Sequence, residues 1–146
     1  LLLYPMHRAM QEYCRELNRL YLENPPLYQN DVDWEGFRWL NVNERDRSSV
    51  AFMRRDFSGN VLVFACNFLP VEFKDFTVGM PCEGELTELL SSDDARFGGS
   101  GSVGGSVAAV GVPFLEHPCS AKLCLPPLTC KLYKLIEKRS CDESND

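Results

Sequence analysis

Several features that would assign a function directly are missing from this 146-residue chain. No apolar run reaches the roughly 18–20 residues that a membrane-spanning helix needs. The apolar opening Leu-Leu-Leu-Tyr-Pro has no cationic region and is too short for a signal sequence. The fifteen Lys and Arg residues are scattered in a chain of net charge −6, so the basic patch of a nucleic-acid-binding protein is missing. We therefore expect a cytoplasmic protein with neither a membrane nor a nucleic acid as partner.

Recognisable catalytic motifs are also missing. The sequence holds no P-loop, no H-E-x-x-H pattern and no EF-hand loop. The adjacent carboxylates Asp93 and Asp94 have no His, Lys or apolar pocket residue close in sequence to shift their pKa, so a solvated turn is the preferred interpretation. His7 and His117 have no Ser or Cys partner nearby in sequence for a nucleophilic pair. From its residues alone the chain does not look like an enzyme.

The seven cysteines are odd in number and irregularly spaced, which favours free thiols in a reducing compartment. The nearest thing to a zinc site is the set His117, Cys119, Cys124 and Cys130, but a C-x-x-C knuckle is missing. Small apolar residues in strands are the simpler interpretation. We expect no metal and no cofactor.

The segment Gly99–Gly104 matches G-x-G-x-x-G, the fingerprint of dinucleotide-binding folds. That site needs a strand before the glycines, a helix after them and an acidic residue about 20 positions further on. Here a polar break precedes the glycines, a β-branched run that stops at Pro113 follows them, and position 124 is a cysteine. We therefore predict a connection between strands and no nucleotide site.

What is present begins with an amphipathic helix over residues 5–23. Its apolar stripe consists of Met6, Met10, Tyr13, Leu17 and Leu20. Pro5 suits the first turn, and Asn24-Pro25-Pro26 ends the helix. If nothing covers the stripe, we expect self-association through this exposed face.

Beyond residue 30 the apolar period changes from about 3.6 to 2, which indicates strands. The expected strands are 36–41, 49–55, 60–69, 73–79, 85–90, 106–115, 120–125 and 128–136. Many short strands between turn signals predict a mainly β domain, an antiparallel β-sandwich or Greek-key barrel. Within 120–125, the sequence predicts inward positions for Ala121, Leu123 and Leu125 and outward positions for Ser120, Lys122 and Cys124.

Three aromatic residues lie close together in the segment 31–40. Phe37 and Trp39 share strand parity, so we expect them in the core. Trp34 lies outside that alternation, and an exposed Trp offers a flat apolar face for a sugar ring. Because large aromatics are mostly buried, packing of Trp34 at the junction of helix and sandwich is the favoured alternative.

The ordered segments 4–28, 33–40, 48–56 and 61–71 resemble the C-terminal part of bacterial-type 1,4-α-glucan branching enzymes, and 88–101 and 120–133 extend the resemblance. It implies that residues 1–29 are the terminal helix of a truncated (β/α)8 catalytic barrel, that 30–139 are the all-β C-terminal domain, and that 140–146 are an acidic tail. Four positions depart from the family's usual residues, namely Leu3, Cys119, Cys124 and Cys130.

The resemblance also implies a function. Branching enzymes cleave an α-1,4 linkage, hold the glucan as a covalent glycosyl-enzyme and transfer it to a 6-hydroxyl, which is retaining chemistry on paired carboxylates. In the family those carboxylates lie on the barrel, upstream of this sequence, so no catalytic residue is assigned here. The expected role is to pack on the barrel and help position α-glucan. The alternative is a stand-alone α-glucan-binding β-sandwich without catalysis.

Overall fold

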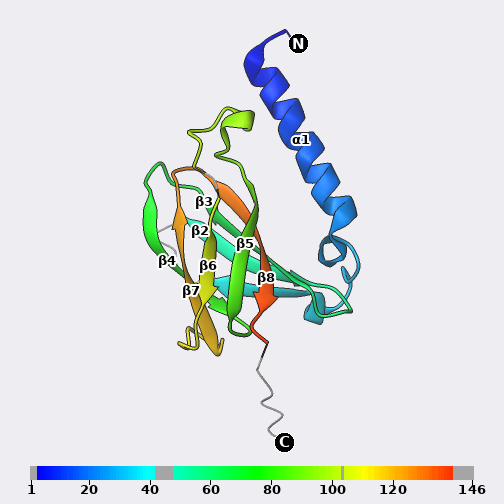
Figure 1. The fold of residues 1–146 in the computed structure, drawn as a ribbon, viewed down its shortest axis with the longest axis vertical. Coiled ribbons are helices and arrows are strands. Elements are labelled where there is room, and N and C mark those ends of the chain that lie inside the picture. The colour runs from blue at the N-terminus through cyan, green and yellow to red at the C-terminus, as the bar shows by residue number, and fades with distance from the viewer. Residues whose placement is uncertain (1–2, 42–47, 103, 140–146) are drawn as a thin grey trace, which may run out of the picture.

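The computed structural model describes residues 3–41, 48–102 and 104–139. It shows one α-helix, α1, followed in these ranges by eight strands in two antiparallel sheets (Figure 1). This confirms the mainly β fold predicted from the sequence. The predicted acidic tail 140–146 lies outside the described residues.

The helix α1 spans Pro5–Glu23, the range predicted from its apolar stripe. Proline occupies the first turn, and the helix ends at Asn24, whose backbone N–H and side-chain amide both donate to the carbonyl of Leu20. A short 3-10 turn, η1 (Pro25–Leu27), follows directly because proline cannot continue the helix. None of the helices in the described ranges has both the length and the apolar character needed to cross a bilayer.

Six strands form the larger sheet, in the order β1-β2-β3-β8-β5-β6, and two form the smaller sheet, β4-β7. Their bounds are β1 Phe37–Asn41, β2 Ser49–Arg55, β3 Val61–Asn67, β4 Phe73–Met80, β5 Gly84–Ser91, β6 Ser106–Ala109, β7 Cys119–Leu125 and β8 Cys130–Glu137. The consecutive strands β7 and β8 lie in different sheets. Pro126 and Pro127 therefore carry the chain from the smaller sheet to the larger one.

The main core fills the space between the two sheets. From the smaller sheet come Phe76, Val78, Leu123 and their neighbours, and the larger sheet contributes residues from all six of its strands. Ala121, Leu123 and Leu125 are buried as predicted, while Lys122 and Cys124 are exposed. Ser120 differs from the expected outward, solvated position. It is 6% exposed, and its backbone pairs with that of Val110 in an isolated bridge.

Two other expectations are corrected by the structure. The predicted strand 106–115 ends at Ala109, and only a single bridge at Val110 continues its pairing before Pro113. Phe37 and Trp39 do share a face, but it is the face of the larger sheet that turns away from the main core. Trp39 is 49% exposed there.

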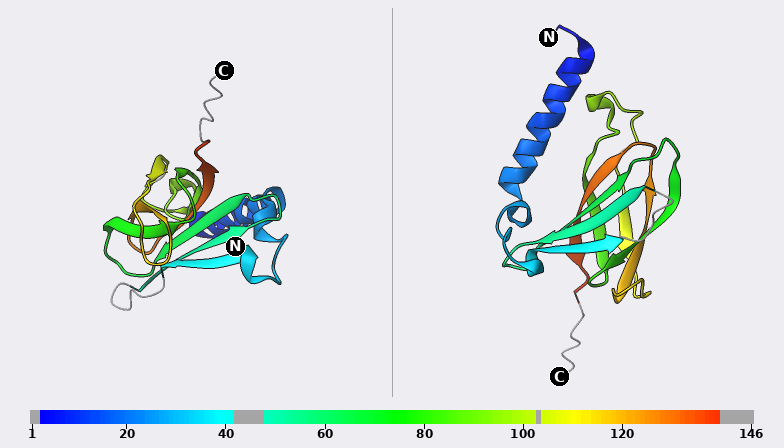
Figure 2. Two further views of the ribbon diagram at one scale, coloured as in Figure 1. Left: turned by 90° about the horizontal axis from the view of Figure 1, so that it is seen from below. Right: turned by 180° about the vertical axis from the view of Figure 1, so that it is seen from behind.

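A second, smaller cluster joins α1 to this outer face of the larger sheet (Figure 2). Leu20 packs with Leu62, Leu90 and Leu132, and Tyr13 is among the partly buried residues around them. Arg54 secures the segment after the helix: its guanidinium donates to the carbonyl oxygens of Pro26 (3.2 Å) and Asn30 (3.4 Å) and pairs with Asp31. The C-terminal half of α1 is thus part of the folded unit.

Candidate functional site

Trp34 lies in a 3-10 turn, η2 (Trp34–Gly36), that precedes the edge strand β1. The turn lies close to the preceding loop. A Cβ at Gly36 would lie 2.1 Å from the carbonyl oxygen of Asn30, so only glycine fits at this position. The indole is 71% exposed, and the guanidinium carbon of Arg38 lies 5.6 Å from its ring centroid. Burial at the junction of helix and sandwich, the favoured expectation, is therefore wrong. Trp34 has the exposure that a sugar platform needs.

Four aromatic side chains form a row across β1, β2 and β3 on the outer face of the larger sheet. The members of this aromatic row are Phe37, Trp39, Phe52 and Phe64. Phe52 stacks on Phe37 with centroids 5.2 Å apart and on Phe64 at 4.8 Å. Trp39 meets Phe37 edge-on at 5.0 Å. The sequence analysis missed Phe52 and Phe64, although both alternate with inward residues of their strands.

Trp34 and the aromatic row are separate surfaces. Arg38, which packs on Trp34, lies between Phe37 and Trp39 along β1, and successive residues of a strand point to opposite faces. Two different apolar surfaces therefore flank the edge strand, and substitution can test them independently.

The N-terminal half of α1 presents a third apolar surface. Met6 is 66% exposed and Met10 is 61% exposed, in contrast to Leu20 at 4%. A cavity of about 180 Å³ lies beside them and is lined by Met6, Met10, Tyr13, Ser92 and Phe97. Tyr13 and Phe97 close it from one side with an edge-to-face contact at 5.0 Å. The helix stripe is thus covered at one end and open at the other.

The Gly/Ser segment connects β5 to β6, as predicted, through a third 3-10 turn, η3 (Ala95–Phe97). Asp93 holds it: its carboxylate accepts from the Ser100 hydroxyl, the Ser100 N–H (3.1 Å) and the Ser102 N–H (3.2 Å). Burial opposes ionisation of Asp93, but these hydrogen bonds outweigh it and lower its pKa. Asp94 caps η3 through the Arg96 N–H at 2.9 Å. Each of the two carboxylates thus organises the loop through hydrogen bonds of its own.

The residues considered as metal ligands are not brought together. The His117 ring packs on Gly79, where a Cβ would lie 2.2 Å from the ring, and its Nε2 lies 3.1 Å from the carbonyl oxygen of Trp39. Cys119 is buried in the main core, and Cys124 donates to Glu72 at 3.5 Å. In the described ranges, no three His, Cys, Asp or Glu side chains converge in a way that could hold a metal ion. His7, the other histidine, meets Tyr4 edge-on at 5.5 Å.

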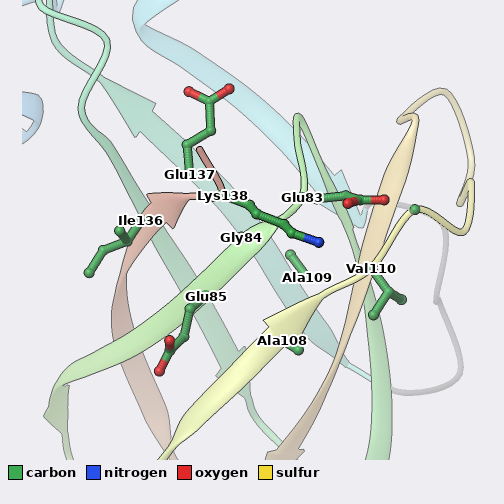
Figure 3. Close-up of a pocket in the computed structure, with 10 residues that line it drawn as sticks. Glu83, Gly84, Glu85, Ala108, Ala109, Val110, Ile136, Glu137 and Lys138 are labelled. Atoms are coloured by element: carbon green, nitrogen blue, oxygen red, sulfur yellow. The ribbon is translucent and has the colours of Figure 1, made fainter. Parts of the chain in front are cut away.

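A shallow hollow of about 450 Å³ lies where β5 begins and where β6 and β8 end (Figure 3). The carboxylates of Glu83, Glu85 and Glu137 line it but point in three different directions. A carboxylate pair of the kind that hydrolyses glycosides needs two groups facing one bond. This hollow does not supply one.

The geometry described so far is that of a β-sandwich with apolar surfaces and, among its described residues, no cluster of possible metal ligands. Residues 39–136 match the family model "Alpha amylase, C-terminal all-beta domain". The match covers most of the chain and both sheets. The chain belongs to this family.

The relatives of this α-amylase C-terminal domain are named 1,4-alpha-glucan branching enzyme GlgB. The protein of Burkholderia vietnamiensis (strain G4 / LMG 22486) is 46% identical over 125 residues, which is 85% of this chain and 17% of the relative. That of Synechococcus sp. (strain CC9902) is 40% identical over 149 residues, 99% of this chain and 19% of the relative. That of Synechocystis sp. (strain ATCC 27184 / PCC 6803 / Kazusa) is 41% identical over 140 residues, 94% and 18%. The chain thus spans about a fifth of the length of these relatives.

Proposed function

We propose that the chain is the C-terminal part of a 1,4-α-glucan branching enzyme, which transfers α-1,4-glucan segments to 6-hydroxyls. The observation that carries this proposal is a sequence match. It covers 85–99% of this chain and 17–19% of the length of proteins with that name. In this proposal the segment supports the catalytic domain and does not carry the reaction. Its own role is to pack on a (β/α)8 barrel and to help position glucan.

The open end of the helix supports the packing role. Residues 1–29, proposed as the terminal helix of the barrel, precede the region matched by the family model, and the proposed β domain covers 30–139. Met6 and Met10 lie in the half of α1 that the sandwich leaves uncovered. An exposed apolar stripe of this kind needs a partner, and the barrel is the proposed one.

Trp34 is the proposed contact with glucan. Its exposed ring is a flat apolar surface for the C–H side of a pyranose, and the neighbouring Arg38 guanidinium can donate to sugar hydroxyls. The edge position leaves the ring accessible to a long polymer. Binding at one aromatic platform would be weak, so a polymer rather than a single sugar is the appropriate probe.

The proposal is tested first by activity. The 146-residue chain, incubated with amylose, should form no α-1,6 linkages, as measured by debranching and chain-length analysis. Formation of branches by this chain alone would overturn the assignment of catalysis to a missing barrel. Light scattering should show self-association that Met6→Ser/Met10→Ser reduces, and a strictly monomeric wild-type chain would contradict the uncovered-stripe argument.

Glucan binding is tested separately by affinity electrophoresis in gels that contain maltodextrin or glycogen. Trp34→Ala should remove most of the retardation, while the matched control Phe57→Ala, another exposed aromatic at 70%, should leave it unchanged. Trp39→Ala reports on the aromatic row. Equal retardation of wild type and Trp34→Ala would remove Trp34 from the proposal.

The stand-alone α-glucan-binding module remains the second candidate, because the exposed Trp34 and its Arg38 neighbour serve either role. The two candidates differ in what precedes the chain. Sequencing the gene upstream of the first codon distinguishes them. Several hundred further in-frame codons support the enzyme part, whereas a stop codon followed by a start supports the module.

A further inference from the structure

Two cysteines distant in sequence lie side by side on the outer face of the larger sheet. Cys66 of β3 is directly opposite Cys130 of β8, and both thiols are free. The Cys130 N–H donates to Ser92 Oγ (2.9 Å), and the Cys130 carbonyl accepts from the Ser92 N–H (3.0 Å). The backbone polar groups of Cys130 thus point toward β5, which makes Cys66 and Cys130 a non-hydrogen-bonded pair.

The backbone of such a pair suits a disulfide. Opposite residues of a non-hydrogen-bonded antiparallel pair have Cα atoms about 4.5 Å apart, with both side chains on the same face. Disulfides in proteins span Cα separations of about 4.4–6.8 Å. Little backbone movement is therefore needed to join Cys66 to Cys130.

The two thiols are chemically different. A hydrogen bond from Cys66 lowers the pKa of Cys130 to about 7, while the same hydrogen bond and burial raise the pKa of Cys66. The hydrogen bond thus favours ionisation of Cys130 and keeps the proton on Cys66, which makes Cys130 the nucleophile of the pair. A thiol whose pKa lies near the ambient pH is close to optimal for attack on a disulfide.

A cavity lies close to Cys130, although neither cysteine of the pair lines it. The cavity of about 180 Å³ between α1 and η3 is lined by Ser92, which bonds both backbone groups of Cys130. Tyr13 lines the same cavity, and its pKa is raised by burial and by Cys130 and Cys66. The cavity therefore lies close to the cysteine pair, and Cys130, which is half-buried, is the more accessible member.

We propose that Cys66 and Cys130 form a redox couple that takes a low-molecular-weight disulfide as its oxidant. The Cys130 thiolate attacks one sulfur of the disulfide, forms a mixed disulfide and expels one thiolate, which takes up a proton. Cys66 then loses its proton to solvent and attacks Cys130 Sγ, which expels the second thiolate. In total, two cysteine thiols are oxidised to one disulfide and one disulfide is reduced to two thiols, so atoms and electrons balance.

The other described cysteines lack this arrangement. Cys124 is exposed and paired with Glu72, Cys119 lies in the main core, and Cys82 has a pKa raised by burial first and then by Glu137. Cys14 is exposed on α1. The proposed step is thus specific to the pair and does not follow from cysteine content. Its product would cross-link β3 to β8 beneath the helix.

The test equilibrates the reduced 146-residue chain with oxidised and reduced glutathione in varying ratio and maps the products by mass spectrometry. The expected product is a Cys66–Cys130 linked peptide that has lost two hydrogens, with Cys124 left free. The Cys66→Ser variant should instead trap glutathione on Cys130. The Cys130→Ser variant should react at Cys66 roughly tenfold more slowly, because that thiol is buried and burial disfavours its ionisation. Cys124→Ser is the control and should form the linked peptide as wild type does.

A second measurement needs no variant that could fail to fold. The rate of iodoacetamide labelling at Cys130 in the wild-type chain should reach half its maximum near pH 7. Labelling of Cys124 should need a higher pH, since burial raises its pKa. Two results would overturn the proposal. One is a linked peptide that joins other cysteines, and the other is a pH of half-maximal labelling for Cys130 that equals or exceeds that of Cys124.

Discussion

The two faces of the larger sheet are both apolar, but they are covered in different ways. Along β3, Val61, Val63 and Ala65 point into the main core, while Leu62 and Phe64 point to the outer face. The smaller sheet packs on the inner face, where residues of both sheets form the main core. The outer face is covered at one end by the C-terminal half of α1, and the aromatic row leaves Trp39 half exposed at the other end.

This difference indicates which part of the molecule is complete on its own. A strand with apolar residues on both sides needs a layer on each side. The inner layer comes from the two sheets, whereas the outer layer consists of α1 with the short turns η1 and η3 (Figure 2). The N-terminal half of α1 keeps Met6 and Met10 exposed. The inner core therefore stabilises the domain, and the outer face keeps apolar side chains exposed. The following substitutions test this division.

The largest expected effect is on the inner face. Leu123→Ala removes a fully buried side chain from the centre of the main core and should lower the free energy of unfolding by about 4 kcal/mol. Urea denaturation followed by tryptophan fluorescence measures it. The matched control Leu128→Ala, at a residue 67% exposed, should change stability by less than about 0.5 kcal/mol. Equal losses for the two variants would contradict the placement of the core.

The next effect concerns a buried ion pair at one end of the inner face. Lys131 Nζ lies 2.7 Å from Glu88 Oε1, with side chains 7% and 5% exposed. Lys131→Met leaves the carboxylate buried without its cation and should cost about 3 kcal/mol in urea denaturation. The double variant Lys131→Met/Glu88→Met should return to within about 1 kcal/mol of wild type, because an apolar pair carries no desolvation penalty. A double variant as unstable as the sum of the single ones would refute the coupling.

A smaller effect is expected on the outer face. Leu20→Ala removes the one fully buried anchor of α1 and should cost about 2 kcal/mol, less than Leu123→Ala because the surrounding cluster can relax. Hydrogen exchange should become faster throughout 5–23 while the strands of the main core keep their protection. Simultaneous loss of protection in β7 would mean that helix and sandwich unfold as one unit, and the division between the faces would fail.

How much the sequence predicts follows the same division. Local periodicity identifies α1 and all eight strands, because each pattern is contained in one element. The strand expected over 106–115 stops early because Gly111 and Pro113 interrupt a β-branched run that otherwise looks continuous. Features that depend on register across the sheet stay invisible. Cys66 and Cys130 are far apart in sequence, and nothing in either segment indicates that the two strands become neighbours.

Trp34 shows a different limit of sequence analysis. Hydrophobicity predicts that an indole is buried, but a three-residue turn before an edge strand places it outside both apolar layers. Gly36 of the same turn lies against the backbone of Asn30, and this contact positions the turn that carries Trp34. Such contacts between neighbouring loops have no periodic signature.

The smallest effect on stability should appear in the loop after β5, where Phe97 packs on Tyr13 of α1. Asp93 accepts three hydrogen bonds within this loop, and its pKa is lowered because those bonds outweigh the effect of burial. A carboxylate with a lowered folded pKa stabilises above its unfolded pKa of about 4 and loses that contribution as pH falls through the folded pKa. Asp93→Asn should therefore cost about 1 kcal/mol at pH 7, with no difference from wild type at the lowest pH. The control Asp75→Asn, at an exposed site on β4, should show no such pH-dependent difference.

Hydrogen exchange of residues 99–102 measures the effect of Asp93→Asn on the loop directly. If exchange there speeds up while Tyr13 and α1 keep their protection, the loop supports its own turn only. If exchange in α1 also becomes faster, the packing of the helix on the outer face depends on the Asp93 carboxylate, whereas the main core on the inner face does not.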